Sequence, residues 1–281
     1  MNQKEYLDKL HEVQIEILDE IDRICKENNI TYFLVGGTML GAVRHNGFIP
    51  WDDDVDIGML RADYDRFKEL CLNSDVLNKK YFLHCLDTDK NYWLPFMKVR
   101  KNNTTFGEKF IKNLDTHKGI FVDIFPYDNV KYEKNFFQKI RSFLILNIEN
   151  AVLCKHKLKK ANNCRRKIAV KSLMMLSLNQ LYKFQNYLFN IKINKNTKYI
   201  VCFIAGGNPA DETLERKRVF PVKEMEFEGK MYPCIKDYDY YLKRVYGDYM
   251  KLPPKNKRVT HSPEIISFNE GKNYKNKKVS K

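Results

Sequence analysis

The stretch FLVGGTMLGAVRHNGFIPWDDDVDIGM, from Phe33 to Met59, decides the fold of this chain. It opens with apolar residues that run into Gly36-Gly37, which is typical of a buried strand entering a tight turn. A short helix is expected over Thr38 to Val43, and VDIGM at the end predicts a second buried strand. Together with the elements on either side, these segments are expected to form a mixed α+β domain.

Four aspartates surround the start of the second strand. Residues two apart share one face of a strand, so Asp54 and Asp56 are expected to project together while Val55 packs behind them. Carboxylates that close repel each other unless a cation lies between them. Hard divalent cations prefer oxygen ligands and bind through one or two carboxylates plus substrate phosphates. The pattern predicts a Mg²⁺ or Mn²⁺ site on Asp54 and Asp56, with Asp52 and Asp53 as further candidate ligands.

The glycine pair is the candidate phosphate site. Glycine lets the backbone approach a phosphate closely, and the N–H groups at a helix start favour anions. Thr38 can add a hydroxyl. A Gly-Gly turn alone is weak evidence, because any tight turn favours glycine, but here an aspartate-rich strand follows after one short loop. Together Gly36, Gly37 and Thr38 indicate a phosphate bound next to a metal.

A third carboxylate, Asp123, lies inside the apolar segment GIFVDIFP, which predicts another strand that Pro126 ends. An aspartate between aromatic residues in a strand requires a partner. That partner is either a basic side chain, which makes Asp123 structural, or a metal or a substrate hydroxyl, which makes it a ligand or a general base.

Elements on either side complete the α+β pattern. Apolar residues at steps of three and four predict a long helix from Glu5 to Asn28, and a second helix begins near Arg61. The lysine-rich region 132–190 has helical apolar patterning and is expected to form a helical subdomain or insertion. Shorter elements are expected as strands at Tyr81–Leu86, Pro95–Arg100 and YIVCFIAGG, a hairpin about Glu228-Gly229 and a helix at Tyr238–Val245.

We therefore predict a mixed β-sheet flanked by helices. Residues 1–268 are expected to form one domain, and residues 269–281 a disordered basic tail.

The formal charge of +15 would attract polyanions such as nucleic acid or an anionic membrane face. No zinc, helix-turn-helix or RNA-binding motif accompanies it, so no specific nucleic acid is expected. The aromatic residues of the middle region suit either a peripheral membrane contact or an ordinary helical core; these are Tyr182, Phe184, Tyr187 and Phe189.

The seven cysteines are scattered without a C-x-x-C pair, which favours free thiols in a reducing compartment. The N-terminus has no apolar signal segment, and no apolar stretch approaches the length of a membrane span. We expect a cytoplasmic protein, with the inner membrane face as a candidate location.

The segment Phe33–Met59 closely resembles the signature of the LicD family, which includes the fukutin-related transferases and belongs to the nucleotidyltransferase-fold superfamily. The hydrophobic-Gly-Gly pattern, Asp-x-Asp and a later strand aspartate are typical of the superfamily, and the loop RHNGFIPWDDD is typical of LicD. GIFVDIFPYD and RVYGDYMKLPP, followed by Arg258 and His261, resemble the later blocks of the family. Nothing in the helical middle region can be matched.

The resemblance implies an enzyme that moves a phospho-substituent, phosphocholine foremost, from a CDP-linked donor such as CDP-choline to a hydroxyl of a cell-surface glycan. CMP leaves, and the acceptor could be linked to a lipid. Asp54 and Asp56 would correspond to the metal-binding pair of the family, and Asp123 to its third carboxylate. In chemical terms, the metal would neutralise the diphosphate during an in-line attack by the sugar hydroxyl.

Several residues around this core are candidates for binding substrate. Arg44 and His45 could hold the diphosphate or position the acceptor, and Trp51 could stack on cytosine or contact a choline ammonium. Lys98 and Arg100 alternate on one strand face, where they could bind phosphate or pair with the aspartates. Arg258 follows a Pro-Pro turn that could return it to the site, and His261 is a candidate catalytic acid or base.

Two alternatives remain open. A true nucleotidyltransferase would attack the alpha phosphorus and leave the nucleotide on its sugar or small-molecule acceptor. A protein that binds nucleic acid or an anionic surface without catalysis would explain the basic charge. However, it would not need to keep the mutually repelling Asp54, Asp56 and Asp123.

Overall fold

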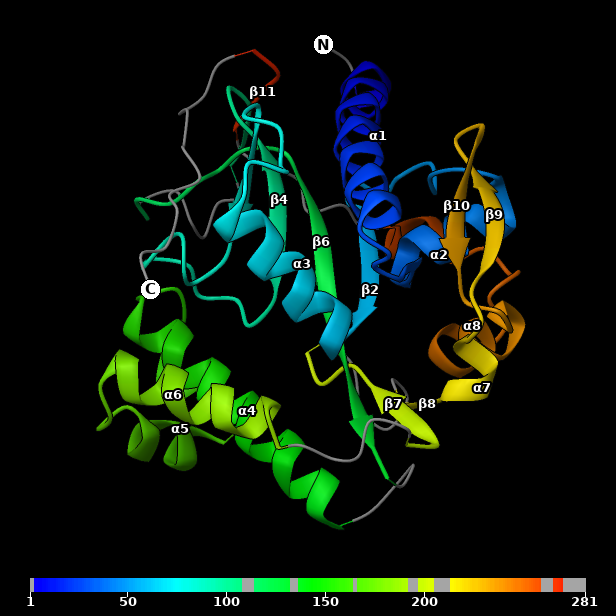
Figure 1. Cartoon of the computed structure of the whole chain (residues 1–281). Helices are drawn as coiled ribbons and strands as arrows, with labels where there is room; N and C mark the ends of the chain where they lie inside the picture. The colour runs from blue at the N-terminus through cyan, green and yellow to red at the C-terminus, as the bar shows by residue number, and fades with distance from the viewer. Residues whose placement is uncertain are drawn as a thin grey trace.

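The computed structural model describes residues 3–107, 114–131, 136–163, 166–191, 197–204, 213–258 and 265–269. In this part of the chain, a mixed sheet of nine strands forms the centre of the molecule (Figure 1). Its main path is ordered β3-β4-β6-β2-β1-β10-β9, and β7 joins β6 to β8. The strands are β1 Tyr32–Leu34, β2 Asp56–Leu60, β3 Tyr81–His84, β4 Met97–Lys101, β6 Phe121–Val130, β7 Tyr199–Val201, β8 Thr213–Glu215, β9 Lys223–Phe227 and β10 Lys230–Cys234. The predicted α+β class is confirmed.

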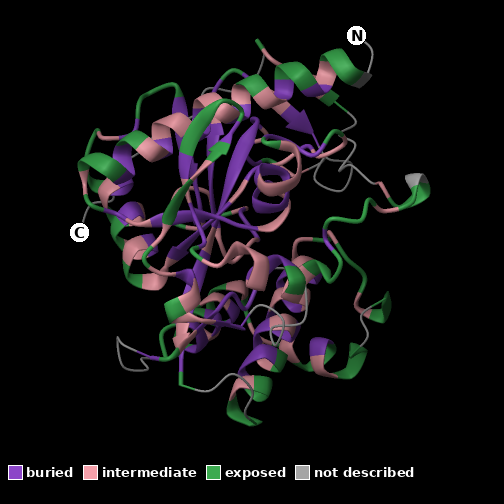
Figure 2. Ribbon diagram, turned by 90° about the vertical axis from the view of Figure 1, so that its right-hand side faces the viewer, coloured by how far each residue is buried: buried purple, intermediate pink, exposed green. Residues whose placement is uncertain are grey.

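The strand pairing mixes directions. β2 runs parallel to β6, and β1 runs parallel to β10, whereas β1 is antiparallel to β2 and β4 is antiparallel to β6. A small second sheet pairs β5 Thr105–Gly107 with β11 Ile265–Ser267. Figure 2 shows the central strands as the most buried part of the molecule, with exposed residues on the outer faces of the helices.

The first helix confirms its amphipathic prediction. α1 spans Gln3–Glu27, and its apolar stripe, which includes Leu10, Ile17 and Ile24, is fully buried. α1 packs on β4 and β6, while α3 Arg61–Asn73 packs on β2, β3 and β6. α2 Gly36–His45 follows β1 directly and packs against β2 and β9.

Several boundaries differ from the sequence predictions, and three of them concern the segments around the candidate site. α2 begins at Gly36 itself and continues to His45, so Arg44 and His45 form its last turn rather than a loop. β2 begins only at Asp56, which leaves Asp54 in the segment before the strand. The prediction that Pro126 ends its strand is wrong, because β6 continues to Val130.

Proline is tolerated at this point of β6 for a structural reason. β4 pairs with β6 up to Ile124, and β7 pairs with it from Asp128 onwards. Pro126 lies in the gap between these two partners, where a missing N–H donor breaks no pairing with either strand.

The middle region is helical, as predicted. It contains α4 Phe136–Lys155, the short 3₁₀ helix η2 Ala161–Asn163, α5 Lys167–Leu173 and α6 Leu178–Phe189. These helices pack on one another at one end of the molecule (Figure 1). Whether they are an insertion into one domain of residues 1–268 stays a prediction.

The last third contains the predicted hairpin and helix. β9 and β10 pair about Glu228 and Gly229, both of which have positive φ, as a two-residue hairpin turn requires. α7 Arg216–Val219 precedes the hairpin, α8 Tyr238–Tyr246 follows it, and η3 Lys255–Lys257 lies near the end. The six cysteines of the described residues are buried and form no disulfide bond. The predicted tail, apart from Asn269, lies outside the described residues.

Candidate active site

Neighbouring strands bring Asp56, Asp123 and Lys98 side by side. In the parallel pairing of β2 with β6, Asp56 is the direct partner of Asp123, and in the antiparallel pairing of β4 with β6, Lys98 is the partner of the same Asp123. The backbone N–H of Asp123 also donates to the carbonyl of Val55 at 2.9 Å. Three charged side chains therefore lie at one level of the sheet, although they come from distant parts of the sequence.

The Gly36-Gly37 turn lies directly against two of the carboxylates. A Cβ added to Gly36, which has a φ of +57°, would lie 2.7 Å from a carboxylate oxygen of Asp56. A Cβ added to Gly37 would lie 2.5 Å from a carboxylate oxygen of Asp52. A side chain at either position would force the carboxylate that it meets to move. Glycine at both positions thus lets the two carboxylates lie close to the turn.

The aspartates repel one another strongly. Burial raises the pKa of Asp56 well above its usual range, and the neighbouring Asp54, Asp123 and Asp52 raise it further, against a smaller opposing effect of Lys98. A divalent cation would reverse this balance, because it stabilises the ionised carboxylates.

The same residues offer the oxygen ligands that such a cation prefers. Among the described residues, Asp52, Asp53 and Asp54 can place one carboxylate oxygen each within 4.8 Å of one another. Asp56 lies next to this group and is repelled by two of its members. A hard cation such as Mg²⁺ fits a donor set made of carboxylates.

Lys98 neutralises Asp123 directly. Its Nζ lies 2.6 Å from Oδ1 and 2.9 Å from Oδ2 of Asp123, and it lies 3.5 Å from the centroid of the Phe121 ring. Of the two interpretations given to Lys98, the pairing with the acidic cluster is the one that the structure contains.

Arg100 lies apart from the carboxylates. It is almost fully buried, and its guanidinium donates to Nδ1 of His84 at 2.8 Å and to the carbonyl of Gly119 at 2.6 Å. Burial lowers the pKa of His84 to about 3, so that the ring stays neutral and can accept from Arg100. The structure therefore assigns Arg100 to a buried network and not to the surface of the site.

The first turn of α2 already has two side-chain partners. The N–H of Gly36 donates to the hydroxyl of Tyr241 at 2.8 Å, and the hydroxyl of Thr38 accepts from the N–H of Asp56 at 2.8 Å. The first helical hydrogen bond runs from the N–H of Met39 to the carbonyl of Val35. Gly37 and Thr38 thus have no acceptor within the helix for their N–H groups, which leaves them as donors suited to an anion.

Arg44, Trp51 and Arg258 form a second group of candidate residues. Nη1 of Arg44 donates to the carbonyl of Tyr249 at 2.7 Å, and Arg258 places its guanidinium 4.5 Å from the centre of the Trp51 ring. Burial lowers the pKa of Arg44, and the positive charge of Arg258 lowers it further. Arg258 therefore contacts Trp51, and its binding of substrate stays a prediction.

Of the two candidate histidines, only His45 lies within the described residues. His45 lies next to Arg44 in the last turn of α2, where burial lowers its pKa and Arg44 lowers it further. His261 lies outside the described residues, so its role as acid or base stays a prediction.

Three residues that the sequence analysis did not single out also hold the site. Nε2 of His11 lies 2.8 Å from the carbonyl of Asp52, and Gln14 donates to the carbonyl of Asp53 at 2.8 Å. Both lie on α1, where polar residues interrupt the apolar stripe, and that interruption was the available signal. No sequence pattern indicated a role for Tyr241.

An open cavity of about 660 Å³ lies beside Trp51, the residue that precedes the aspartates in the chain. Trp51 and Pro50 from the loop, His11 from α1 and Glu228 from the hairpin turn contribute to its wall. The ring of His11 is stacked on Phe48 at 3.6 Å, which fixes this wall against Asp52.

A mixed sheet that presents aspartates beside a Gly-Gly helix start defines a nucleotidyltransferase-like enzyme. The domain family described as LicD/FKTN/FKRP, nucleotidyltransferase domain, matches residues 29–158. The lipopolysaccharide cholinephosphotransferase LicD of Haemophilus influenzae is 30% identical over 254 residues, which cover 89% of this chain and 93% of that protein. This chain belongs to the LicD family and is a phosphotransferase.

Two shorter similarities agree with this assignment. An uncharacterized protein of Rickettsia typhi is 29% identical over 41% of this chain and 42% of its own length. The human ribitol 5-phosphate transferase FKRP is 46% identical over 41 residues, which are 15% of this chain and 8% of that protein.

Proposed function

We propose that this enzyme transfers a phospho-substituent, with phosphocholine as the favoured group, from a CDP-linked donor to a hydroxyl of a cell-surface glycan and releases CMP. The observation that carries the proposal is the convergence of Asp52, Asp54, Asp56 and Asp123 on the Gly36-Gly37 turn. The name of the Haemophilus influenzae relative supports the choice of phosphocholine and of a glycan acceptor.

Asp54 and Asp56 would hold Mg²⁺ or Mn²⁺, with Asp52 and Asp53 as additional ligands. The bound ion supplies charge neutralisation for the diphosphate. The N–H groups of Gly37 and Thr38 are suited to orient a phosphate oxygen, and the glycine turn permits the close approach. Lys98 keeps the carboxylate of Asp123 in place next to Asp56.

In the transfer, the oxygen of the sugar hydroxyl forms a bond to the distal phosphorus, and the bond from this phosphorus to the bridging oxygen breaks. CMP leaves with that electron pair. The hydroxyl proton passes to a base, for which Asp123 and His261 are the candidates.

The donor's cytidine is assigned to the cavity beside Trp51. This cavity borders Asp52 through His11 and Phe48, and the Trp51 ring offers a flat apolar surface for a base. Arg258 lies on the Trp51 ring and close enough to Arg44 to affect its pKa, so that both positive charges would attract the negatively charged donor.

The test measures CMP release from several CDP-linked donors, CDP-choline among them, with Mg²⁺ or with EDTA. We expect release with at least one donor, loss of release in EDTA, and a decrease of at least ~100-fold in a folded Asp54→Asn variant, because one ligand of the metal is removed. Asp75→Asn, at an exposed position away from the site, is the matched control and should keep full activity.

Equal CMP release by Asp54→Asn and wild type would contradict the assignment of the site. A label in the choline or in the cytidine of the donor distinguishes the two transfer reactions. Transfer of the cytidine label to the acceptor would identify a true nucleotidyltransferase instead.

We further propose that the middle helices contact the inner face of an anionic membrane. Residues 136–191 contain eleven lysines and arginines but a single acidic residue, Glu149. Phe136, Phe137, Ile140 and Phe143 expose between 37% and 77% of their surface along the start of α4. Exposed apolar side chains among basic residues favour the interface of an anionic bilayer. No helix in the described part of the chain is long and apolar enough to cross a membrane.

The aromatic residues of α6 that the sequence analysis considered for membrane contact are mostly not well exposed. Phe189 is buried, Tyr182 and Phe184 are half-buried, and Tyr187 alone is well exposed. For most of that group the helical core is therefore the observed environment, and the start of α4 is the better candidate surface.

A further inference from the structure

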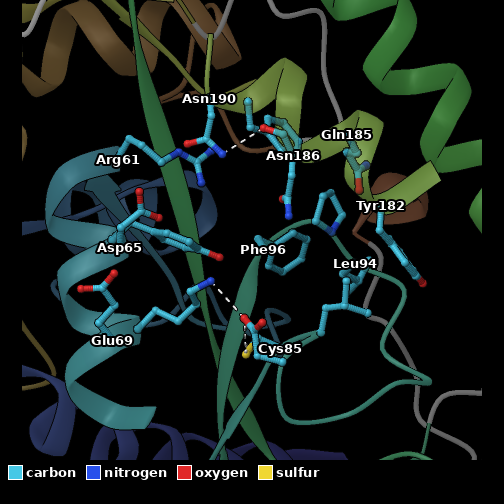
Figure 3. A pocket seen from close by; sticks show the side chains of 16 residues that line it. Arg61, Asp65, Glu69, Cys85, Leu94, Phe96, Tyr182, Gln185, Asn186 and Asn190 are labelled. Atoms are coloured by element: carbon cyan, nitrogen blue, oxygen red, sulfur yellow. Dashed lines mark hydrogen bonds and ion pairs between the residues drawn. The ribbon is translucent and has the colours of Figure 1, made fainter. Parts of the chain in front are cut away.

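A second cavity, of about 300 Å³, lies between α3 and α6, apart from the aspartate cluster (Figure 3). Asp65 and Glu69 face it from α3, and Gln185 and Asn186 from α6. Phe96, just before β4, contributes an aromatic ring between them. A concave site with a few polar groups around apolar rings is the usual form of a small-molecule site.

Both cations of this cavity are already paired. The guanidinium of Arg61 contacts both carboxylate oxygens of Asp128, at 2.9 and 3.1 Å, and Nζ of Lys68 lies 3.0 Å from Asp87. Asp65 and Glu69 add negative charge. A phosphate group would meet no uncompensated positive charge here, so the cavity is suited to a ligand without negative charge.

Gln185 shows which groups such a ligand must carry. This residue is 5% exposed, its amide lines the cavity, and it makes no hydrogen bond to any of the described residues. A ligand that displaces water from this amide without replacing its hydrogen bonds loses about 1–3 kcal/mol, and the amide needs both an acceptor and donors to be satisfied. Hydroxyl groups can supply both. The trimethylammonium group of choline can supply neither.

The cavity is connected to the aspartate cluster through Phe96. The Phe96 ring lies 4.5 Å from that of Phe125, and Nζ of Lys98, which holds Asp123, lies 5.4 Å from the centre of the Phe96 ring. A ligand in the cavity would thus lie beside the wall that carries Lys98 and Asp123.

We propose that this cavity binds a sugar ring of the glycan acceptor, with Gln185, Asn186 and Asp65 as hydrogen-bonding groups and Phe96 as the apolar wall. The assignment rests on the proposed transfer function. α6 lies outside the residues 29–158 that match the family domain, so this wall can differ between relatives while the aspartates stay the same. It would therefore determine which acceptor is used.

The experiment measures binding of methyl glycosides of glucose, galactose and N-acetylgalactosamine to the full-length protein by saturation-transfer NMR, with choline chloride as the comparison ligand. Wild type should bind at least one glycoside. Gln185→Leu, which keeps the size of the side chain, should bind it about tenfold more weakly, as expected when a buried hydrogen-bonding group is removed.

Asn186→Leu, at an exposed position of the same cavity, should weaken binding as well and tests the site should Gln185→Leu fail to fold. Asn179→Leu, exposed on the same helix but outside the cavity, is the matched control and should bind as wild type does. Saturation of choline but of no glycoside, or equal sugar binding by wild type and both cavity variants, would overturn the inference.

The result of this sugar-binding experiment can be distinguished from the result of the CMP-release test. Asp54→Asn should bind the glycoside normally although its CMP release is strongly decreased. Sugar binding that survives in a protein without any CMP release would contradict the transfer function alone, whereas normal CMP release without sugar binding would contradict the cavity assignment alone.

Discussion

Two glycines with the same backbone conformation show how a single residue can be required for different reasons. Gly36 has a φ of +57° and lies against Asp56, while Gly229 has a φ of +73° and no atom within 4 Å of an added Cβ. Both positions disfavour other residues through the backbone. Only Gly36 is also constrained by the carboxylate that it contacts.

This difference leads to a paired prediction. Gly36→Ala and Gly229→Ala should each lower the free energy of unfolding by about 1–2 kcal/mol, because alanine is strained at positive φ. Gly36→Ala should in addition reduce CMP release by ~100-fold, since the methyl group displaces Asp56, and small displacements in an active site have effects of that order. Urea denaturation and CMP release measure the two effects. Full activity of Gly36→Ala would show that the contact with Asp56 is not needed.

At the level of elements, the sequence predicted most of the sheet because its signals are local. The alternation around Asp56, the apolar run before Gly36 and the Glu228-Gly229 turn each determine their own segment. The pairing of Asp56 with Asp123 was not predictable in the same way, because strand order and register depend on contacts between distant segments.

The differences at Pro126 and Arg100 also arise from contacts between distant segments of the chain. Pro126 would end a strand with partners on both sides throughout, but here it lies in the gap between β4 and β7, which sequence alone does not reveal. Arg100 shares a strand face with Lys98, yet His84 and Gly119 bind it in a buried network. Alternation gives the face of a residue but not the partner that it meets there.

Within α4, Glu149 predicts a measurable pH dependence. Burial raises the pKa of Glu149 to about 7, although Lys159 acts in the opposite direction. The folded state therefore keeps this proton when the unfolded state has lost it. The resulting contribution to stability is complete below about pH 4.5 and is lost as the pH rises towards 7, by up to ~3 kcal/mol.

Glu149→Gln should remove this dependence. In urea denaturation at pH 8 the variant should be more stable than wild type, by up to ~3 kcal/mol, and at pH 4 the two should be nearly equal. Glu12→Gln, at an exposed position of α1, serves as the control and should change stability little at either pH. A variant that is no more stable than wild type at pH 8 would show that Glu149 is ionised at no cost in the folded protein.

At the scale of the whole molecule, the two cavities are built by different elements. The cavity beside Trp51 is built by α1, the loop before β2 and the hairpin turn, whereas the cavity with Gln185 is built by α3, α6 and the segment before β4. The first suits the donor and the second the acceptor. The middle helices thus supply both a wall of the proposed acceptor site and the proposed membrane surface.

The membrane proposal can be tested on the intact protein. Phe136→Ser with Phe137→Ser should reduce co-sedimentation with phosphatidylglycerol vesicles by about tenfold or more, because two aromatic side chains that are 71% and 77% exposed no longer enter the interface. Wild type should bind neutral phosphatidylcholine vesicles weakly, and salt should weaken its binding to the anionic ones, because the lysines and arginines of residues 136–191 supply the attraction. Met231→Ser with Ile265→Ser removes two apolar side chains of similar exposure on other elements and should leave binding unchanged. Binding that is equal in both double variants, or equal on neutral and anionic vesicles, would show that the start of α4 is not the membrane surface.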